Sequence, residues 1–259
     1  EELKEFDRLK TVFLSNVSHE LRTPLVTIRG YLEMILKEQL GKITEVQKKY
    51  LGISLKNCIR LASFIDELLD FTKYETGRAK FDMRPFPLEP AIRDCIESIR
   101  PQLREKEISI EYKLPPTMPL VVGDQDKVTQ VFINLLSNAE KFNRHQGKIM
   151  IEVSSEQGNY LWIKVKDTGI GIPEEHRSRV FDRFYQVDSS ITRCYGGSGI
   201  GLAIVKNIIE GHGGTISVDS QLNSGTTFTF SLPIAHDSLE TGSGDPILPP
   251  GSAGSPDPA

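Results

Sequence analysis

The chain has 259 residues, of which 38% are hydrophobic and 25% are charged, and its formal net charge is -4 at pH 7. An ordinary apolar fraction and a small net charge exclude a chain that is disordered throughout, and the length predicts one or two domains. The absence of a basic block argues against nucleic acid as a partner, and no apolar run reaches the roughly 18 residues of a membrane span. Three scattered cysteines, Cys58, Cys95 and Cys194, fit neither a disulfide framework nor a CxxC metal site, so we expect a cytoplasmic location.

Residues 1 to about 75 predict two long helices. Apolar side chains recur every three or four residues from Leu3 to Ile35 and again from Val46 to Phe71, with a break at residues 40–42. A short connection between two such helices predicts an antiparallel hairpin. Because two helices alone leave much of each apolar stripe in water, we expect a homodimer in which two hairpins form a four-helix bundle.

The rest of the chain predicts an α+β two-layer sandwich, with helices on one face of a mixed sheet. Prolines punctuate residues 81–90, which predicts a boundary between domains. We place the hairpin domain at 1–77, a joint at 78–86, the sandwich at 87–234 and a disordered tail at 235–259. The expected helices are 88–105, 127–142, 174–184 and 199–210, and the expected strands are 108–114, 148–154, 160–167, 215–218 and 226–232, the second and third of which form a hairpin.

The first candidate site is residues 18–25, Ser-His-Glu-Leu-Arg-Thr-Pro-Leu, in the first helix. Helical geometry turns His19 away from the apolar stripe and toward solvent, on the face that also carries Thr23. A partly neutral imidazole is a nucleophile, and the neighbouring Glu20 can accept its ring proton. Pro24 is expected to bend the helix. An ordinary surface histidine is the alternative, whereas the zinc pattern HExxH fails because Thr23 replaces the second histidine.

The second candidate site is one face of the helix over 127–142. Asn134, Asn138 and Lys141 fall at i, i+4 and i+7, so two amides and an ammonium share one side. Such a face is able to hold a metal ion and phosphate oxygens. A solvated polar face is the alternative.

Two glycine-rich segments complete the candidates. Asp167 and the glycines at 169 and 171 follow a strand, where backbone can approach a ligand closely. Residues 196–202 open a helix, whose first N–H groups attract phosphate. Glu174 replaces the third glycine of a dinucleotide fingerprint, and no Gly-Lys-Ser/Thr of a P-loop follows, so plain strand-to-helix turns remain the alternative.

Taken in order, five motifs resemble the H, N, G1, F and G2 boxes of two-component sensor histidine kinases. They are SHELRTPL (18–25), NLLSNAEKF (134–142), DTGIGIP (167–173), FDRFYQ (181–186) and GGSGIGLAI (196–204). The resemblance covers about residues 5 to 233. It implies a dimerisation and phosphotransfer hairpin followed by a Bergerat-type, gyrase-like ATP-binding domain, and therefore a protein-histidine kinase.

The same resemblance implies a role for individual residues. His19 matches the phosphoacceptor, Glu20 its neighbouring base, and Thr23 the residue that orients water for dephosphorylating the partner. Asn138 matches the magnesium ligand, and Asp167 matches the carboxylate that accepts the adenine amine. The remaining expected nucleotide contacts are Asn134, Lys141, Phe142, Gly169, Gly171, Tyr185, Gly197, Gly199, Gly201, Leu202 and either Thr226 or Thr227.

Two positions depart from the family pattern. Glu140 stands where relatives usually carry an apolar residue, and Gln186 where several carry a basic residue that reaches the terminal phosphate. Lys141, Arg183 or Arg193 would then have to supply that positive charge. The segment between Val187 and Ser198 is expected to be a mobile lid.

The resemblance implies ATP and Mg²⁺ as cofactors and the receiver domain of a response regulator as partner. The phosphoryl group would pass from ATP to His19 and then to an aspartate of the regulator, and the chain could also act as its phosphatase. A helix already under way at Glu1 indicates a fragment that lacks an upstream sensor region, so the parent protein is compatible with a membrane anchor. A gyrase-type clamp ATPase and a catalytically silent dimeric scaffold are the alternatives.

Overall fold

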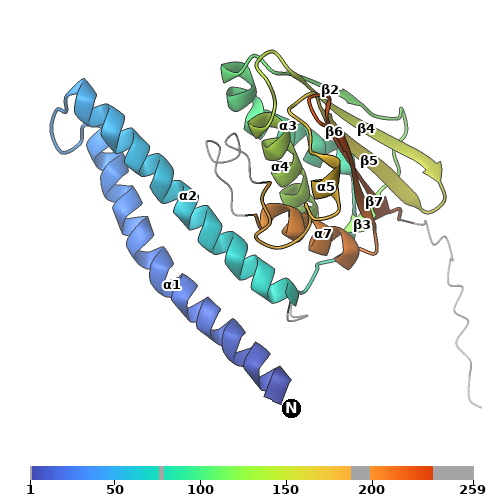
Figure 1. The fold of residues 1–259 in the computed structure, drawn as a ribbon, viewed down its shortest axis with the longest axis horizontal. Helices are drawn as coiled ribbons and strands as arrows, with labels where there is room; N and C mark the ends of the chain where they lie inside the picture. Colours follow the sequence, from blue (N-terminus) through green and yellow to red (C-terminus); the bar gives the residue numbers. More distant parts are fainter. Residues whose placement is uncertain (1, 76–78, 188–198, 236–259) are drawn as a thin grey trace, which may run out of the picture.

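The computed structural model describes residues 2–75, 79–187 and 199–235, without the side chains of residues 2–16, 19, 71–73, 75, 156 and 157. The expected tail and most of the expected lid therefore lie outside the described residues. Within the described ranges, the chain forms a helical hairpin and an α/β sandwich, as the sequence predicts (Figure 1). No helix in these ranges is long and apolar enough to cross a membrane.

The hairpin consists of α1 (Glu2–Leu36) and α2 (Glu45–Glu75), which lie antiparallel. Thr44 and Gln47 begin α2 as a capping box: the Thr44 N–H donates to Gln47 Oε1 over 2.8 Å, and the Gln47 N–H donates to Thr44 Oγ1 over 3.2 Å. Few described side chains are buried between the two helices, chiefly Leu25, Cys58 and Ile65. The small size of this cluster agrees with the expectation that a hairpin by itself leaves apolar surface in water.

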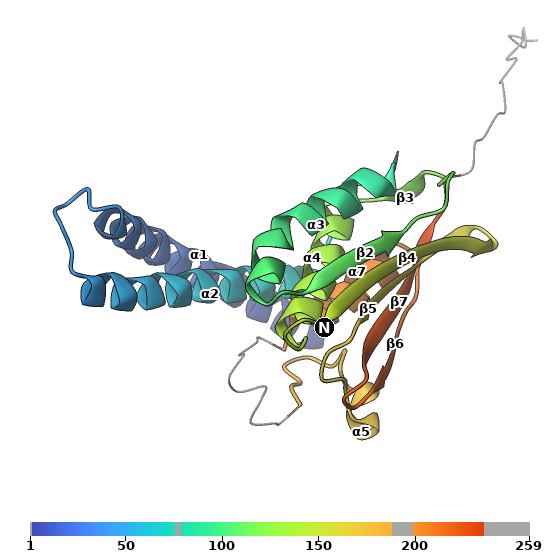
Figure 2. The same cartoon turned by 90° about the horizontal axis from the view of Figure 1, so that it is seen from above.

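The sandwich is built on a five-stranded mixed sheet in the order β2-β4-β5-β7-β6. Only the β2–β4 pair is parallel, and the other three pairs are antiparallel. The strands are β2 (Ser109–Lys113), β4 (Lys148–Gln157), β5 (Tyr160–Asp167), β6 (Ile216–Gln221) and β7 (Gly225–Pro233). Three helices cover one face of the sheet (Figure 2), namely α3 (Leu88–Glu105), α4 (Gln125–Lys141) and α7 (Gly201–Gly211).

The main core lies between this sheet and its helices. Alternating residues of β4 and β5 point into it, and they meet the apolar stripes of α3, α4 and α7. Phe132 of α4 and Phe230 of β7 contact each other edge to face, with ring centroids 5.6 Å apart. The polar ends of α4, β5 and α7 are thereby fixed on a rigid support.

Two local elements differ from the expectation. β1 (Arg84–Phe86) lies in the segment expected to be a joint and pairs with β3 (Val121–Gly123), a strand that the sequence did not indicate. The helix expected over 174–184 is only one turn, α5 (Glu174–Arg177). Turns follow it as far as Phe184, which has a φ of 57° and donates its N–H to the Gly199 carbonyl over 2.9 Å.

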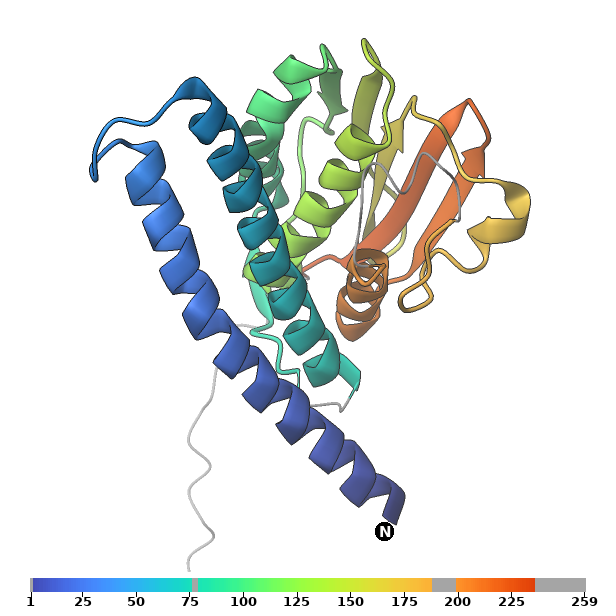
Figure 3. The ribbon, with the colours of Figure 1, turned by 60° about the vertical axis from the view of Figure 1, so that its left-hand side comes forward.

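The hairpin lies against the sandwich through α2. Contacts join α2 to α7, and α2 lies between α1 and the sandwich (Figure 3). The Asp70 carboxylate of α2 forms an ion pair with Lys127 of α4 at 3.3 Å. Of the two hairpin helices, α1, which carries His19, is therefore the one farther from the sandwich.

Candidate functional site

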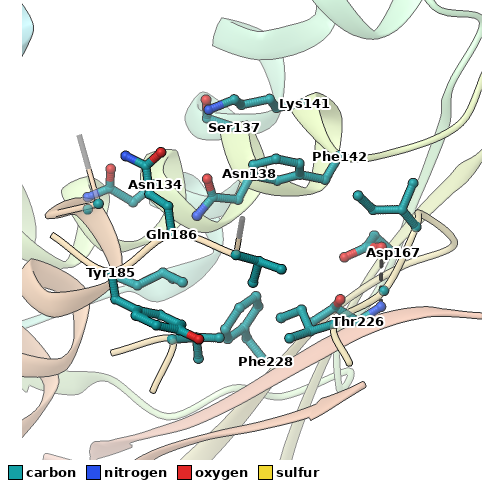
Figure 4. A pocket seen from close by; sticks show the side chains of 18 of the residues that line it. Asn134, Ser137, Asn138, Lys141, Phe142, Asp167, Tyr185, Gln186, Thr226 and Phe228 are labelled. Carbon is teal, nitrogen blue, oxygen red and sulfur yellow. Dashed lines mark hydrogen bonds between the residues drawn. The ribbon is translucent and has the colours of Figure 1, made fainter. Parts of the chain in front are cut away.

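A cavity of about 410 Å³ lies where α4, the end of β5, the start of α7 and the turn after β6 meet (Figure 4). It brings together residues of four of the five motifs that were far apart in the sequence. The described lining residues are Glu67, Asn134, Ser137, Asn138, Lys141, Phe142, Asp167, Ile170, Gly171, Ile172, Pro173, Val180, Tyr185, Gln186, Val187, Gly199, Gly201, Leu202, Leu222, Asn223, Thr226 and Phe228.

Asp167 is the buried acid of this cavity, with 7% of its surface exposed. Its Oδ1 accepts the N–H of Gly169 over 2.8 Å and the N–H of Thr226 over 3.2 Å. Burial raises the pKa of this carboxyl group to about 6, although the two backbone hydrogen bonds lower it. Its other oxygen points into the cavity (Figure 4), where it can accept a hydrogen bond from a ligand amine.

Two glycines beside Asp167 are required by close backbone contacts. A Cβ at Gly169 would lie 2.3 Å from the Phe142 carbonyl oxygen. Gly171 has a φ of 70°, and a Cβ there would lie 2.0 Å from the Gln221 carbonyl oxygen. The glycines thus let the turn after β5 close on its neighbours. Gly171 lines the cavity as expected, whereas Gly169 is not among the described lining residues.

The polar face of α4 forms another wall. Asp124 caps this helix, since its Oδ1 accepts the Lys127 N–H over 3.1 Å. Asn134 and Asn138 line the cavity from the expected face (Figure 4). Lys141 also lines it, and burial lowers the pKa of its ammonium group.

The donor set fits a magnesium nucleotide. Mg²⁺ commonly binds one or two protein oxygens and completes its shell with phosphates and waters. The amide oxygens of Asn134 and Asn138 are such ligands, and among the described residues no group of three or more acidic, His or Cys side chains forms a metal cage. Asp167 and the apolar lining suit a flat base. The cavity therefore has one part that fits a base and another that fits phosphate groups.

Tyr185 lies at the opposite wall and is held by two partners. Its hydroxyl is 2.5 Å from His176 Nδ1, and the Arg179 guanidinium lies 4.2 Å from the centre of its ring. Thr226 is buried and lines the cavity, whereas Thr227, which follows it on β7, is absent from the lining because successive strand residues face opposite sides. The structure therefore favours Thr226 of the two candidates.

The departure at Glu140 has a structural reason. Its carboxylate forms an ion pair with Lys106 at 3.0 Å, and the Lys106 ammonium also donates to the Glu140 and Lys141 carbonyl oxygens. Lys106 thus closes the C-terminal end of α4, where carbonyls lack helical partners. Glu140 is not part of the lining, whereas Gln186, the other departure, does line the cavity.

Several expected residues lie away from the cavity or outside the description. The backbone of His19 is helical in α1, but its side chain is not described; Glu20 and Thr23 are exposed on the same helix. Gly197 and Arg193 lie outside the described residues. The sequence motifs do not indicate Glu67 or the apolar walls formed by Val180, Leu222 and Phe228. Of these, Phe228 has a sequence signal, the alternation of apolar residues along its strand.

Two family models match the chain. Residues 9–77 match the His Kinase A (phospho-acceptor) domain, and residues 123–236 match the histidine kinase-, DNA gyrase B-, and HSP90-like ATPase. The circadian input-output histidine kinase CikA of Thermosynechococcus vestitus is 38% identical over 234 residues, which are 90% of this chain and 32% of that protein. The sensor histidine kinase WalK of Bacillus subtilis is 37% identical over 233 residues, 90% of this chain and 38% of that protein.

Solved structures show the same likeness. Full-length ShkA in complex with AMPPNP matches with a TM-score of 0.72 and 29% identity, over 86% of this chain and 46% of that one. The histidine kinase ThkA in complex with the response regulator TrrA matches with a TM-score of 0.60 and 28% identity, over 91% of this chain and 67% of that one.

Fold, cavity and matches define a phospho-acceptor helical hairpin joined to an ATPase of the gyrase-like class. The chain belongs to the two-component sensor histidine kinases and corresponds to their catalytic core. It spans about a third of the length of the two curated relatives described above.

Proposed function

We propose that this chain transfers the γ-phosphoryl group of ATP to His19 and then to an aspartate of a response regulator. The observation that carries the proposal is the cavity in which buried Asp167 faces the amides of Asn134 and Asn138, in a chain that also carries the SHELRTPL motif. The match to ThkA, which was solved with a response regulator, supports the choice of partner.

Each residue has a part in the proposed reaction. Asp167 accepts the adenine amine, and Asn134, Asn138 and Lys141 hold the phosphate end of the nucleotide. Mg²⁺, when bound at Asn138, neutralises phosphate charge. One ring nitrogen of His19 forms a bond to the γ-phosphorus as the bond to the ADP oxygen breaks, and Glu20 accepts the proton of the other ring nitrogen.

The transfer requires a rearrangement of the docked chain. No described side chain of α1, the helix of His19, lines the cavity, and α2 lies between α1 and the sandwich (Figures 1 and 3). We propose that the sandwich moves relative to the hairpin, or that a second subunit presents its α1. Thr23 and Glu20 would act again when the regulator is dephosphorylated.

Labelling with γ-³²P-ATP and magnesium tests the proposal. We expect a protein-bound label that is stable to alkali and labile to acid, as a phosphorylated histidine is. His19→Gln should abolish it, whereas His145→Gln, a change at an exposed loop histidine, should keep it. Label that persists in His19→Gln would falsify the assignment. An unlabelled protein that hydrolyses ATP would instead support a clamp ATPase.

A further inference from the structure

The docked hairpin contributes one acidic side chain to the nucleotide cavity. Phe64 and Leu68 of α2, one helical turn apart, pack against the core of the sandwich. Two residues further along, Asp70 contacts Lys127 at 3.3 Å and Gln130 Nε2 at 3.5 Å, both on α4. These contacts fix the rotation of α2 about its axis.

This rotation places Glu67 at the cavity, where it is half-buried. It is the one cavity-lining residue contributed by the described part of the hairpin, and it lines the cavity together with Asn134, Ser137 and Lys141 of α4. Ser63, one turn earlier on α2, donates to Glu67 Oε1 over 3.4 Å. The carboxylate is therefore held at this wall by its own helix.

The described lining of the cavity carries more anionic than cationic side chains. Among the described lining residues, Lys141 is the only cation, and the anions are Glu67 and Asp167. Asp167 lies beside Thr226 on the far side of the cavity from Asn134 (Figure 4). Burial and the nearby cations Arg60 and Lys106 lower the pKa of Lys141, whereas Glu140 and Glu67 favour its charged form. An anion on α2 thus acts on the same ammonium group that the phosphates of a nucleotide would use.

We infer that Glu67 competes with the phosphates of the nucleotide for Lys141, so that docking of α2 and binding of the phosphate chain oppose each other. The inference rests on the proposed function and names a regulation of that same site. A carboxylate takes the place of a phosphate oxygen beside the lysine, and phosphates that enter repel it. Coupling between two binding events is reciprocal. A bound nucleotide should therefore weaken the docking of α2 by the same factor by which docking weakens nucleotide binding.

Affinities for Mg²⁺-ADP and for adenosine, measured by calorimetry on the whole chain, test the inference. We expect Glu67→Gln to bind Mg²⁺-ADP about three- to tenfold more tightly and to bind adenosine with unchanged affinity, since adenosine carries no phosphate. Glu45→Gln, the same change at the exposed start of α2, should alter neither affinity. Asp70→Asn, which weakens docking without touching the cavity, should also tighten binding of Mg²⁺-ADP.

Hydrogen exchange gives a second readout. Mg²⁺-ADP should speed the exchange of amides over residues 64–74 in the parent chain, and much less in Glu67→Gln. The inference is overturned if Glu67→Gln leaves the affinity for Mg²⁺-ADP unchanged or weaker. It is also overturned if the variant raises the affinity for adenosine by the same factor as the affinity for Mg²⁺-ADP. A parent chain that binds neither ligand contradicts the proposed function itself, which is a distinct result.

Discussion

The carboxyl group of Asp167 titrates close to neutrality, because burial raises its pKa to about 6. Its ionised form accepts a hydrogen bond from an adenine amine, so binding should weaken as the pH falls through this value. We expect the affinity for adenosine to fall about tenfold between pH 7.5 and 5, as one group with this pKa predicts. Adenosine is the suitable ligand because it has no phosphate that titrates in this range. In Asp167→Asn, binding should be weak and nearly independent of pH.

The burial of Asp167 also lowers the free energy of unfolding of the ligand-free protein at neutral pH. A carboxyl group whose pKa is higher in the folded chain than in the unfolded chain stabilises the fold at low pH, and that stability is lost as the pH rises through about 6. At pH 7.5, Asp167→Asn should therefore raise the free energy of unfolding by on the order of 2 kcal/mol. Thermal melts of both chains at pH 7.5 and 4.5 check this. A variant that is less stable at pH 7.5 would contradict the role of burial.

Gly171 is the glycine for which a side chain should cost most. Gly171→Ala must remain at a φ of 70° and also move the Gln221 carbonyl, so we expect a loss of more than about 2 kcal/mol of unfolding free energy. Gly158→Ala is the matched control, since Gly158 has a φ of 66° but nothing within 4 Å of the added Cβ. Denaturant unfolding compares the two. Equal losses would show that the contact with residue 221 is unimportant.

At the level of elements, Pro24 interrupts the hydrogen bonds of α1, because it has no N–H for the Glu20 carbonyl. Pro24→Ala restores that bond and removes the ring, and we expect it to stabilise the helix by up to about 3 kcal/mol. The melting temperature followed by circular dichroism should rise. An unchanged or lower melting temperature would mean that the proline at position 24 is itself needed for packing of the hairpin.

Periodic elements could be predicted from the sequence, and elements defined by distant partners could not. The helix over 88–105 and the strand hairpin around residues 157–159 follow from local patterns of apolar residues and turn chemistry. β1 and β3 are only three residues each and exist because they pair with each other across 34 intervening residues, from Phe86 to Val121. The same limit applies to the site: motif residues were evident, but Glu67 reaches the cavity only through docking of α2.

For the whole molecule, the exposed apolar residues of the hairpin argue for a second copy. Val46, Tyr50, Ile53 and Leu61 of α2 are all at least 48% exposed and recur at helical spacing, so they form one stripe in water. On α1, Leu21 and Ile28 are similarly exposed. A four-helix bundle of two hairpins would bury these side chains, at about 25 cal/mol per Å² of apolar surface.

A charge within this stripe should separate the copies, because an unpaired ammonium group is costly to bury. We expect the parent chain to have the mass of a dimer in sedimentation equilibrium and Ile53→Lys to shift it to the monomer. Ile59→Lys makes the same substitution at a residue of α2 that is 48% exposed on the side away from the stripe, and it should leave the dimer intact. A monomeric parent chain would rule out the bundle, and the phosphoryl transfer would then have to occur between the sandwich and the α1 helix of the same chain. A dimeric Ile53→Lys would place the interface on another face of the molecule.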